Sequence, residues 1–479
     1  MFKNVIYFSL PYLLSYFLQT LYGMADLFMI GQFEGVASTT AVSVVGSQVM
    51  HMLTVMIVGL AMGTTVSIGQ AVGAGNRKQA AQDIGNAVTL FMAVSVTLMV
   101  ILLVLLRPIV SVMSTPAEAS DGTAAYLIIC LIGIPFITAY NIISSIFRGL
   151  GDSKSPMYFI AVACAANIAL DYLFMGALGL GPAGAALGTT LSQAVSVAVS
   201  LAVILKRKSI VLEKSDFRPC RPIMGKILKI GIPVAFQDGL IQIAFIVITI
   251  IANQRGLNDA AAVGIVEKVI SFLFLVPSSM LSTVSALGAQ NIGAGKPGRA
   301  VRTLRYAIML ATGFGVLATA TVQFIAEPIV ALFTDSSTAN GAEVVRFGGQ
   351  YLRGYIFDCI FAGIHFSFSG YFCACGKSGL SFLHNIVAIA LVRVPGVYLT
   401  SRLFPTTLFP MGLATATGSL LSVIICLIAF AIIRRKSPPC SAGGINMERS
   451  NLFPIGEVSR LFHISVSVLP AGSSGWMLR

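Results

Sequence analysis

Charged residues are scarce in this 479-residue sequence. Asp, Glu, Lys and Arg together make up 10% of it, hydrophobic residues make up 56%, and the mean hydropathy is +0.88. Soluble domains usually contain roughly 25% charged residues, so this composition excludes a large soluble domain. It indicates a polytopic membrane protein.

The sequence also has few residues of the kinds that build metal, redox or nucleotide sites. Its four histidines are dispersed and its eight cysteines are scattered. The closest cysteine pair, Cys373 and Cys375, lacks the two-residue gap of a zinc or redox motif. The glycine-rich turns at 73–75 and 293–295 lack the Lys-Ser/Thr that follows in a P-loop. We therefore predict no catalytic residue, no metal centre, no cofactor and no use of ATP.

Apolar runs long enough to cross a membrane, roughly 20 residues each, can be placed twelve times along the chain. The first six cover residues 5–31, 43–69, 84–106, 124–147, 155–179 and 183–206, and the second six cover residues 226–253, 261–287, 303–325, 346–373, 378–402 and 411–434. The predicted fold class is therefore an all-α polytopic membrane protein with twelve transmembrane helices.

The two halves of the chain repeat each other. The motif QAVGAGNRKQA at residues 70–80 returns as QNIGAGKPGRA at 290–300, an offset of 220 residues. Other landmarks recur at offsets of 222 to 228 residues: Pro11 with Pro233, Gln32 with Gln254, Tyr126 with Tyr351, Gly184 with Gly412, and Thr189 with Thr417. Each half has an even number of spans, so we predict two six-helix lobes related by pseudo-twofold symmetry along the membrane normal. Parallel repeats of this kind occur in alternating-access transporters.

This repeat divides the chain into four segments. We predict an N-terminal lobe at 1–206, an inter-lobe linker at 207–225, a C-terminal lobe at 226–436 and a tail at 437–479. The linker is polar, charged and proline-bearing. The tail has no apolar run of span length and is expected to be unstructured.

The formal net charge of +13 reports membrane topology. Twenty-one Lys and Arg residues lie on the side of the N-terminus, whereas only four lie in the opposite loops: Arg107, Arg255, Arg346 and Arg402. This imbalance is the positive-inside bias, which places both termini in the cytoplasm. Nucleic-acid binding is not expected, and binding to lipid headgroups is a weak addition.

Acidic residues inside the membrane point to the working centre. An ionisable residue at the bilayer centre costs on the order of 3 kcal/mol on insertion scales, so its presence argues for a task or a partner. The first half has Asp26 and Asp171 inside apolar spans, where the second half has Ile248 and Val397.

Each of these acids has an amide on its own helix face. Gln19 lies two helical turns before Asp26, and Asn167 lies one turn before Asp171. With a hydroxyl such as that of Thr189, they form an oxygen-rich set that suits a hard cation such as sodium and equally a proton. Two converging carboxyl groups cannot both be comfortably ionised. The alternative is that a lone Asp caps a broken helix or hydrogen-bonds to a neighbouring span.

The sequence resembles multidrug and toxic compound extrusion (MATE) transporters, most closely their prokaryotic DinF-like branch. The resemblance extends over residues 1–436 and depends on several motifs: MADLFMIGQ at the end of the proline-containing first span, GQAVGAGNRKQA after the second, FRGLGDSKSPM after the fourth, and NIALD followed by GPAGAALGTTLSQ. In that family the N-terminal lobe holds the coupling-cation site. The resemblance therefore implies that Asp26, Asn167, Asp171 and Thr189 surround Na+ or a proton.

The resemblance also assigns neighbouring residues. Gln19, Tyr126 and Asn141 match residues of the adjacent network or drug cavity, and Pro11 matches the proline at which the first helix bends. Another branch uses acids of the seventh and tenth spans. This chain departs from that pattern, and Arg393, which aligns with Asn167, would oppose a cation in the second lobe. The roles of six second-lobe residues stay open: Asp238, Glu267, Lys268, Arg353, Asp358 and Arg393.

These features predict a secondary active multidrug efflux antiporter rather than an enzyme. Na+ or H+ would drive the export of small amphipathic organic cations by alternating access. The protein is expected to be a monomer in the cell inner (plasma) membrane, in contact with lipid.

Two alternatives remain open. One is a lipid-linked oligosaccharide flippase of the same superfamily, for which Lys268, Arg353 and Arg393 would have to line the central cavity. The other is an integral-membrane lipid-modifying enzyme, which would need a clustered acid-base constellation at one membrane face. The acids of this sequence are dispersed and lie in mid-span.

Overall fold

A computed structural model describes residues 1–33, 42, 46–112, 117–207, 212–334 and 337–436. The predicted tail at 437–479 lies outside these residues. The first lobe contains α1 (Phe2–Phe33), α3 (Ser47–Gly73), α4 (Arg77–Val104), α5 (Leu106–Val112), α6 (Ala117–Ile132), α7 (Ile134–Leu150), α8 (Lys154–Asp171), the π-helical turn η2 (Tyr172–Ala177) and α9 (Gly181–Arg207).

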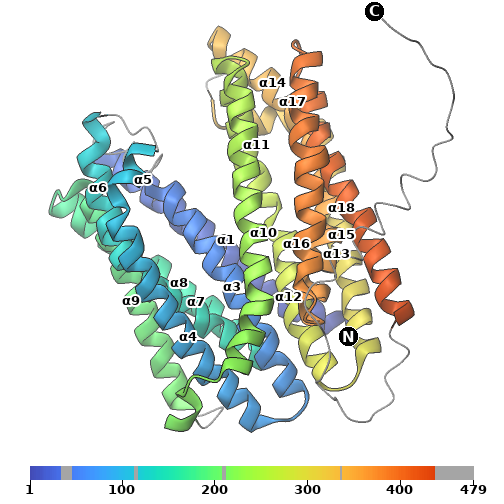
Figure 1. Cartoon of the computed structure of the whole chain (residues 1–479). Coiled ribbons are helices and arrows are strands. Elements are labelled where there is room, and N and C mark those ends of the chain that lie inside the picture. The colour runs from blue at the N-terminus through green and yellow to red at the C-terminus, as the bar shows by residue number, and fades with distance from the viewer. Residues whose placement is uncertain (34–41, 43–45, 113–116, 208–211, 335–336, 437–479) are drawn as a thin grey trace, which may run out of the picture. The chain divides into compact units, whose positions relative to one another are not determined.

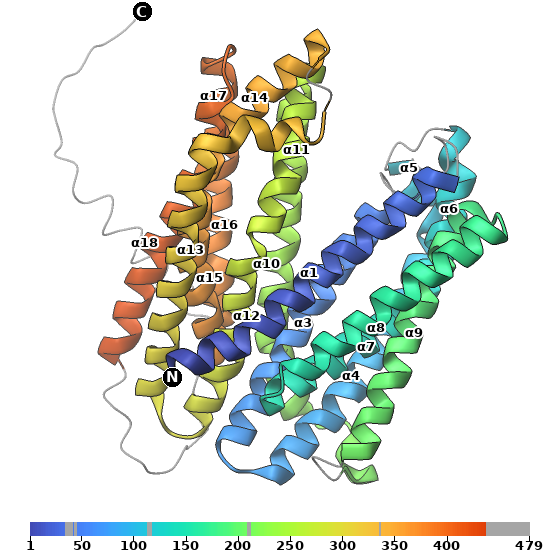
Figure 2. The same cartoon turned by 180° about the vertical axis from the view of Figure 1, so that it is seen from behind.

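The second lobe follows a short 3-10 turn, η3 (Lys214–Phe217). It contains α10 (Arg221–Asn253), α11 (Leu257–Leu273), α12 (Leu275–Gly293), α13 (Pro297–Ala331), α14 (Ala339–Tyr355), α15 (Asp358–Ala374), α16 (Ser378–Ala388), the π-helical turn η4 (Ile389–Arg393), α17 (Val394–Leu403) and α18 (Phe409–Lys436). Figures 1 and 2 show the helices of the two lobes as two separate groups.

Among the described residues, ten helices are long and apolar enough to cross a membrane, and two bent pairs bring the number of spans to twelve. The predicted fold class is thereby confirmed. The bent pairs are the fourth span of each lobe, α6 with α7 at 45° and α14 with α15 at 41°. The first break falls at Gly133, two residues before Pro135, which cannot donate a helical hydrogen bond. The sequence analysis treated both spans as unbroken.

Each lobe has its own apolar core. In the first lobe, Tyr126 and Leu127 of α6 pack with Ile134 of α7 and Met175 of η2. In the second lobe, a larger cluster joins residues of α10, α11, α13, α14, α17 and α18. Burial of apolar side chains at roughly 25 cal/mol per Å² stabilises soluble cores, but between helices in lipid close packing has that role.

The lobes meet through the repeated motif. Gln70 of α3 donates to the carbonyl of Ala374 at 2.9 Å, and Gln290 of α12 donates to the carbonyl of Gly149 at 2.9 Å. The two bonds are the same contact made twice, once from each lobe. The backbones approach so closely here that a side chain at Gly73 would collide with the carbonyl of Gln290. The motif is therefore both a turn and the inter-lobe contact, and sequence analysis identified only the turn.

Helix α1 belongs to the first lobe at one end and contacts the second lobe at the other. The Tyr16 hydroxyl is 2.8 Å from that of Ser282 on α12, and Phe8 and Tyr12 pack against Ala286. In Figures 1 and 2 the N-terminal end of α1 lies beside the second lobe. A movement of α1 would therefore change side-chain contacts in both lobes.

The linker is attached to the first lobe. Asn86 of α4 donates to the carbonyl of Asp216 at 3.1 Å and accepts from the backbone N–H of Cys220 at 2.7 Å. The Thr89 hydroxyl donates to the carbonyl of Phe217 at 2.9 Å. Helix α10 begins at Arg221, five residues before the expected start of the seventh span at 226.

Candidate functional site

Helices α1, α8 and α9 bring the membrane acids of the first lobe together. The Thr189 hydroxyl donates to Asp26 Oδ2 at 3.1 Å. The carboxyl groups of Asp26 and Asp171 lie within interaction distance of each other and of the Asn167 amide. Asn167 and Asp171 are fully buried, and Asp26 is 5% exposed. All four residues predicted for the cation site therefore lie in one cluster, and their part in coupling stays a prediction.

Several polar atoms of this cluster have no hydrogen-bond partner among the described residues. They are Asp26 Oδ1, both carboxylate oxygens of Asp171 and both polar atoms of Asn167. A buried polar group left unmatched costs about 1–3 kcal/mol, so such groups are normally satisfied. No Lys or Arg within the described part of the chain forms an ion pair with either acid. The donor set fits a hard cation with oxygen ligands, and it fits a shared proton equally.

The backbone around Asp171 is shaped to receive its carboxyl group. Helix α8 ends at Asp171 and continues into the π-helical turn η2, a feature that is frequent at functional sites. Gly188 of α9 faces the carboxyl group, and a Cβ atom there would collide with Asp171 Oδ1. Gly188 therefore lies directly against the acid.

Two residues that sequence analysis missed support the cluster. The Tyr22 hydroxyl donates to the carbonyl of Thr189 at 3.1 Å and lies 3.1 Å from the Ser192 hydroxyl. Tyr22 precedes Asp26 by one helical turn and so shares its face. That spacing was the available signal, but a tyrosine in an apolar span is common enough to be overlooked.

The other predicted residues lie at different distances from the acids. Tyr126 of α6 is buried in the apolar core of the first lobe. Asn141 of α7 donates to the carbonyl of Ile137 in its own helix at 2.8 Å. Gln19 is half-buried on α1.

Pro11 lies inside α1, which is helical from Phe2 to Phe33. The Ser15 hydroxyl donates to the Pro11 carbonyl at 2.7 Å. A proline inside a helix removes one backbone hydrogen bond and weakens the helix at that point. Helix α1 is therefore easier to bend at Pro11, between the acid cluster and its N-terminal end.

The second lobe has no equivalent pair of acids. Ile248 and Val397 hold the corresponding positions, and both are buried in the apolar core. Arg393, at the position of Asn167, is buried and pairs with Asp358 at 3.3 Å. The fifth span therefore contains an acidic residue, Asp171, in the first lobe and a basic residue, Arg393, in the second.

The structure also supplies partners for charges whose roles sequence analysis left open. Arg353 pairs with Glu327 at 3.1 Å, and Glu267 accepts from the Thr249 hydroxyl at 3.3 Å. Asp238 accepts from Gln237 at 3.4 Å. Most of these charges thus have local partners, and Lys268 is exposed.

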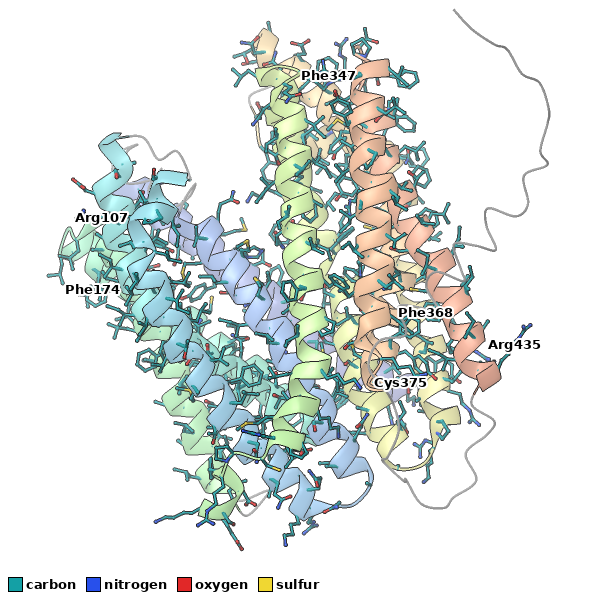
Figure 3. The ribbon with its side chains drawn as sticks, in the orientation of Figure 1. Arg107, Phe174, Phe347, Phe368, Cys375 and Arg435 are labelled. Carbon is teal, nitrogen blue, oxygen red and sulfur yellow. The ribbon has the colours of Figure 1, made fainter. Side chains whose placement is uncertain are left out.

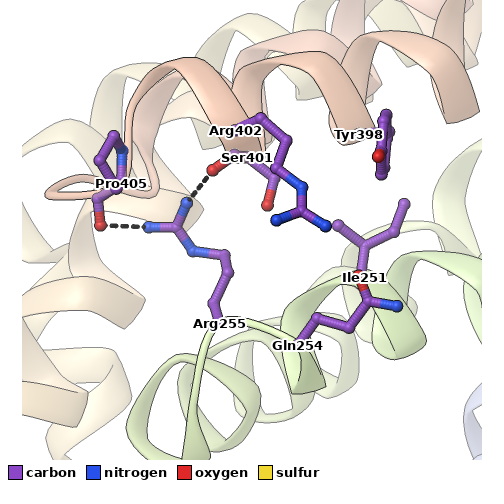
Figure 4. Close-up of a pocket in the computed structure, with 7 residues that line it drawn as sticks. All are labelled: Ile251, Gln254, Arg255, Tyr398, Ser401, Arg402 and Pro405. Atoms are coloured by element: carbon purple, nitrogen blue, oxygen red, sulfur yellow. Dashed lines mark hydrogen bonds between the residues drawn. The ribbon is translucent and has the colours of Figure 1, made fainter.

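A separate pocket of about 230 Å³ lies where α10 and α17 end, lined by Ile251, Gln254, Arg255, Tyr398, Ser401, Arg402 and Pro405 (Figure 4). Arg255 pairs with Asp259 at 2.6 Å and donates to the carbonyls of Ser401 and Pro405 at 2.7 and 2.8 Å. Its hydrogen bonds hold the turn after α17. The pocket belongs to the second lobe and contains none of the residues of the acid cluster.

Two repeated six-helix lobes, with an acid cluster buried in one of them, define a polytopic membrane transporter. The family model MatE matches residues 11–173 and 233–399, once in each lobe and together more than half of the chain. The chain therefore belongs to the MATE family, and it is a transporter and not an enzyme. The two matched segments also reproduce the internal repeat.

Individual relatives agree with this assignment. The chain is 28% identical over 416 residues to the probable multidrug resistance protein YpnP of Bacillus subtilis, covering 87% of this chain and 91% of YpnP. A solved transporter of the MOP superfamily from Pyrococcus furiosus aligns with a TM-score of 0.85, at 22% identity, over 91% of this chain and 97% of that one. The outward-facing structure of a multidrug resistance MATE transporter aligns with a TM-score of 0.83, at 22% identity, over 90% and 95%. At 22% identity, these structural matches show only that the fold is the same.

Proposed function

We propose that this protein is a secondary active antiporter that exports amphipathic organic cations in exchange for Na+ or H+ by alternating access. The observation that carries the proposal is the acid cluster of the first lobe. Asp26 and Asp171 are buried close to each other, and among the described residues no Lys or Arg forms an ion pair with either carboxyl group. A cation or a proton would supply the missing charge.

The coupling ion acts through its different affinity for the two states of the transporter. When it binds, Asp26 no longer requires a polar environment, and the α1 segment between Pro11 and Asp26 is free to move. The same helix reaches the second lobe through Tyr16 and Ser282. Ion binding near Asp26 is thereby linked to the contact of Tyr16 with Ser282 in the second lobe.

We further propose an orientation in the cell inner (plasma) membrane with the N-terminus and Arg435 on the cytoplasmic side. Figure 3 places Arg107 and Phe347 at one end of the lobes and Cys375 and Arg435 at the other. The positive-inside bias assigns the second end to the cytoplasm. The Gln70 and Gln290 contacts join the lobes at that end, so the proposed orientation makes this an arrangement closed towards the cytoplasm.

Purified protein in liposomes tests the proposed exchange. Vesicles containing a cationic dye receive an inward or outward gradient of Na+ or of pH, each imposed alone, and dye movement is followed. Export that depends on one gradient identifies the coupling ion. Dye movement that ignores both gradients would overturn the proposal.

A flippase for lipid-linked oligosaccharides is less well supported. It would require Lys268, Arg353 and Arg393 to be free for a pyrophosphate. Arg393 is buried against Asp358, and Arg353 is paired with Glu327. Only Lys268 is exposed, which is too little for a doubly charged headgroup.

Removal of the paired glutamine contacts is expected to open the cytoplasmic end. In the double variant Gln70→Ala with Gln290→Ala, each lost hydrogen bond contributes about 1 kcal/mol, so the inward-facing population should rise roughly tenfold or more. Cys373 is buried at this contact, beside the Ala374 carbonyl that accepts from Gln70. Its labelling by a maleimide, with Cys373 as the single cysteine, measures the change.

The control for this experiment is Gln79→Ala. Gln79 donates to Asp83 within α4 at 2.8 Å and takes no part in the inter-lobe contact. Equal labelling of Cys373 in the control, the double variant and the parent would mean that the two glutamines do not hold the lobes together.

A further inference from the structure

Arg393 is a full positive charge buried inside the second lobe. It is 8% exposed, its Nη2 atom donates to the Tyr355 hydroxyl at 2.6 Å, and the same atom lies 3.3 Å from Asp358 Oδ2. The guanidinium also lies over the ring of Phe245 at 5.4 Å. An arginine in the membrane is costly unless it is paired and has a task.

The position of Arg393 in the repeat is the position of Asn167. Both residues lie on the fifth span of their lobe, and in both lobes this span contains a π-helical turn, η2 after Asp171 and η4 ending at Arg393. Both fifth spans also pack on a glycine of the sixth: Gly188 faces Asp171, and Gly418 faces Arg393. Each lobe therefore holds a polar side chain of its fifth span in a buried niche against the sixth span, about one helical turn apart in the repeat.

The niches differ in where the charge comes from. In the first lobe the acids are on spans one and five, and no positive side chain of the described residues pairs with them. In the second lobe the acid is Asp358, on the fourth span, and the positive group comes from the fifth span of the protein itself. Glu267 accepts from the Thr249 hydroxyl at 3.3 Å, and Arg393 pairs with Asp358 among the described residues.

We propose that the Arg393 guanidinium is a built-in cation that occupies, in the second lobe, the place that the exchanged ion takes in the first. The inference rests on the proposed function for its comparison with the first lobe. It follows that Asp358 stays compensated in every state of the cycle. The second lobe then has no ion to exchange, and ion-driven movement starts only in the first lobe.

The niche has room for chemistry beyond a simple ion pair. Arg393 Nε, Asp358 Oδ1 and the Tyr351 hydroxyl are all buried without a hydrogen-bond partner among the described residues. Removal of the Arg393 side chain leaves carboxylate and hydroxyl oxygens around a space of guanidinium size. A small cation from solution is expected to bind there.

Chemical rescue of Arg393→Ala tests this. The midpoint of thermal unfolding is followed with a thiol-reactive dye, since Cys359 is buried next to Asp358 and reports unfolding of this niche. The variant should melt several degrees below the parent protein. About 10 mM guanidinium chloride, far below denaturing concentrations, should restore roughly half of the loss, whereas urea, which is uncharged, should restore none.

The matched control is Asp358→Asn with Arg393→Ala, which removes both charges. It should be more stable than Arg393→Ala, because a single deletion leaves a buried carboxylate uncompensated, and it should not respond to guanidinium. Equal responses of the single and double variants, or no rescue of the single one, would overturn the proposal. If Arg393→Ala does not accumulate while both the double variant and Arg393→Lys do, the uncompensated charge is the cause and the proposal stands. If the double variant fails as well, the side chain is needed for packing and the proposal fails.

A second measurement separates this inference from the proposed antiport. In Asp26→Asn with Asp171→Asn, no ion-dependent change in melting temperature should remain. Adding Arg393→Ala to that background should create one, seen as stabilisation by guanidinium. These readouts need no transport, so a failure of dye export in liposomes would leave them unaffected.

Discussion

Replacing Asp26 with Asn is expected to abolish ion-driven export while the protein still folds and inserts. The substitution preserves size and the capacity to accept from Thr189, but it removes the charge that an ion must balance. If the ion no longer binds the two states of the transporter with different affinity, it cannot shift the equilibrium between them. Export under an imposed gradient should therefore fall at least about 100-fold. The assay is dye export from liposomes under the gradient that drives the parent protein.

The melting temperature of the same variant gives a second test. Two facing carboxylates destabilise each other in a dry site, so Asp26→Asn should melt at a higher temperature than the ion-free parent. Its melting temperature should also no longer depend on Na+ or pH in the range where the parent responds. Asp238→Asn, a membrane acid of the second lobe, is the matched control and should keep both export and ion dependence. Normal export by Asp26→Asn would show that the acid cluster does not couple transport.

The spans, the repeat and the acid cluster could be predicted because each depends on a rare feature. Charge is so scarce in the apolar spans that Asp26 and Asp171 stand out without a structure. The repeat follows from a long motif, and the family model matches once in each lobe. Lipid leaves a helix few alternatives, because every backbone polar group must be satisfied internally.

What sequence analysis missed depends on contacts between helices. Tyr22 and Gly188 are ordinary residues for an apolar helix, and only the crossing of α1, α8 and α9 gives them a place at the acids. Likewise, Arg353 pairs with Glu327 and Arg393 pairs with Asp358 because their helices pack side by side. Neither partner is close in sequence, so spacing along the chain could not reveal them.

The largest expected effect after that of Asp26 comes from adding one methyl group at Gly188. A Cβ atom there would collide with Asp171 Oδ1, so Gly188→Ala must displace the carboxyl group from its place against α9. Binding and catalytic groups work only when they are held to within about 0.5 Å, and a misplacement of about 1 Å can cost 100-fold. The ion concentration for half-maximal export should therefore rise roughly tenfold to 100-fold. Ion titration of export in liposomes measures this.

Gly23→Ala is the matched control for this substitution. Gly23 is three residues before Asp26 on α1, and a Cβ atom there meets nothing within 4 Å, so its ion dependence should stay that of the parent. A double-mutant cycle then identifies the collision itself. The loss of stability caused by Gly188→Ala should vanish in an Asp171→Ala background, because the oxygen that the methyl group meets is gone. If the loss persists there, Gly188 serves the packing of α9 rather than the placement of the acid, because the effects of independent sites add.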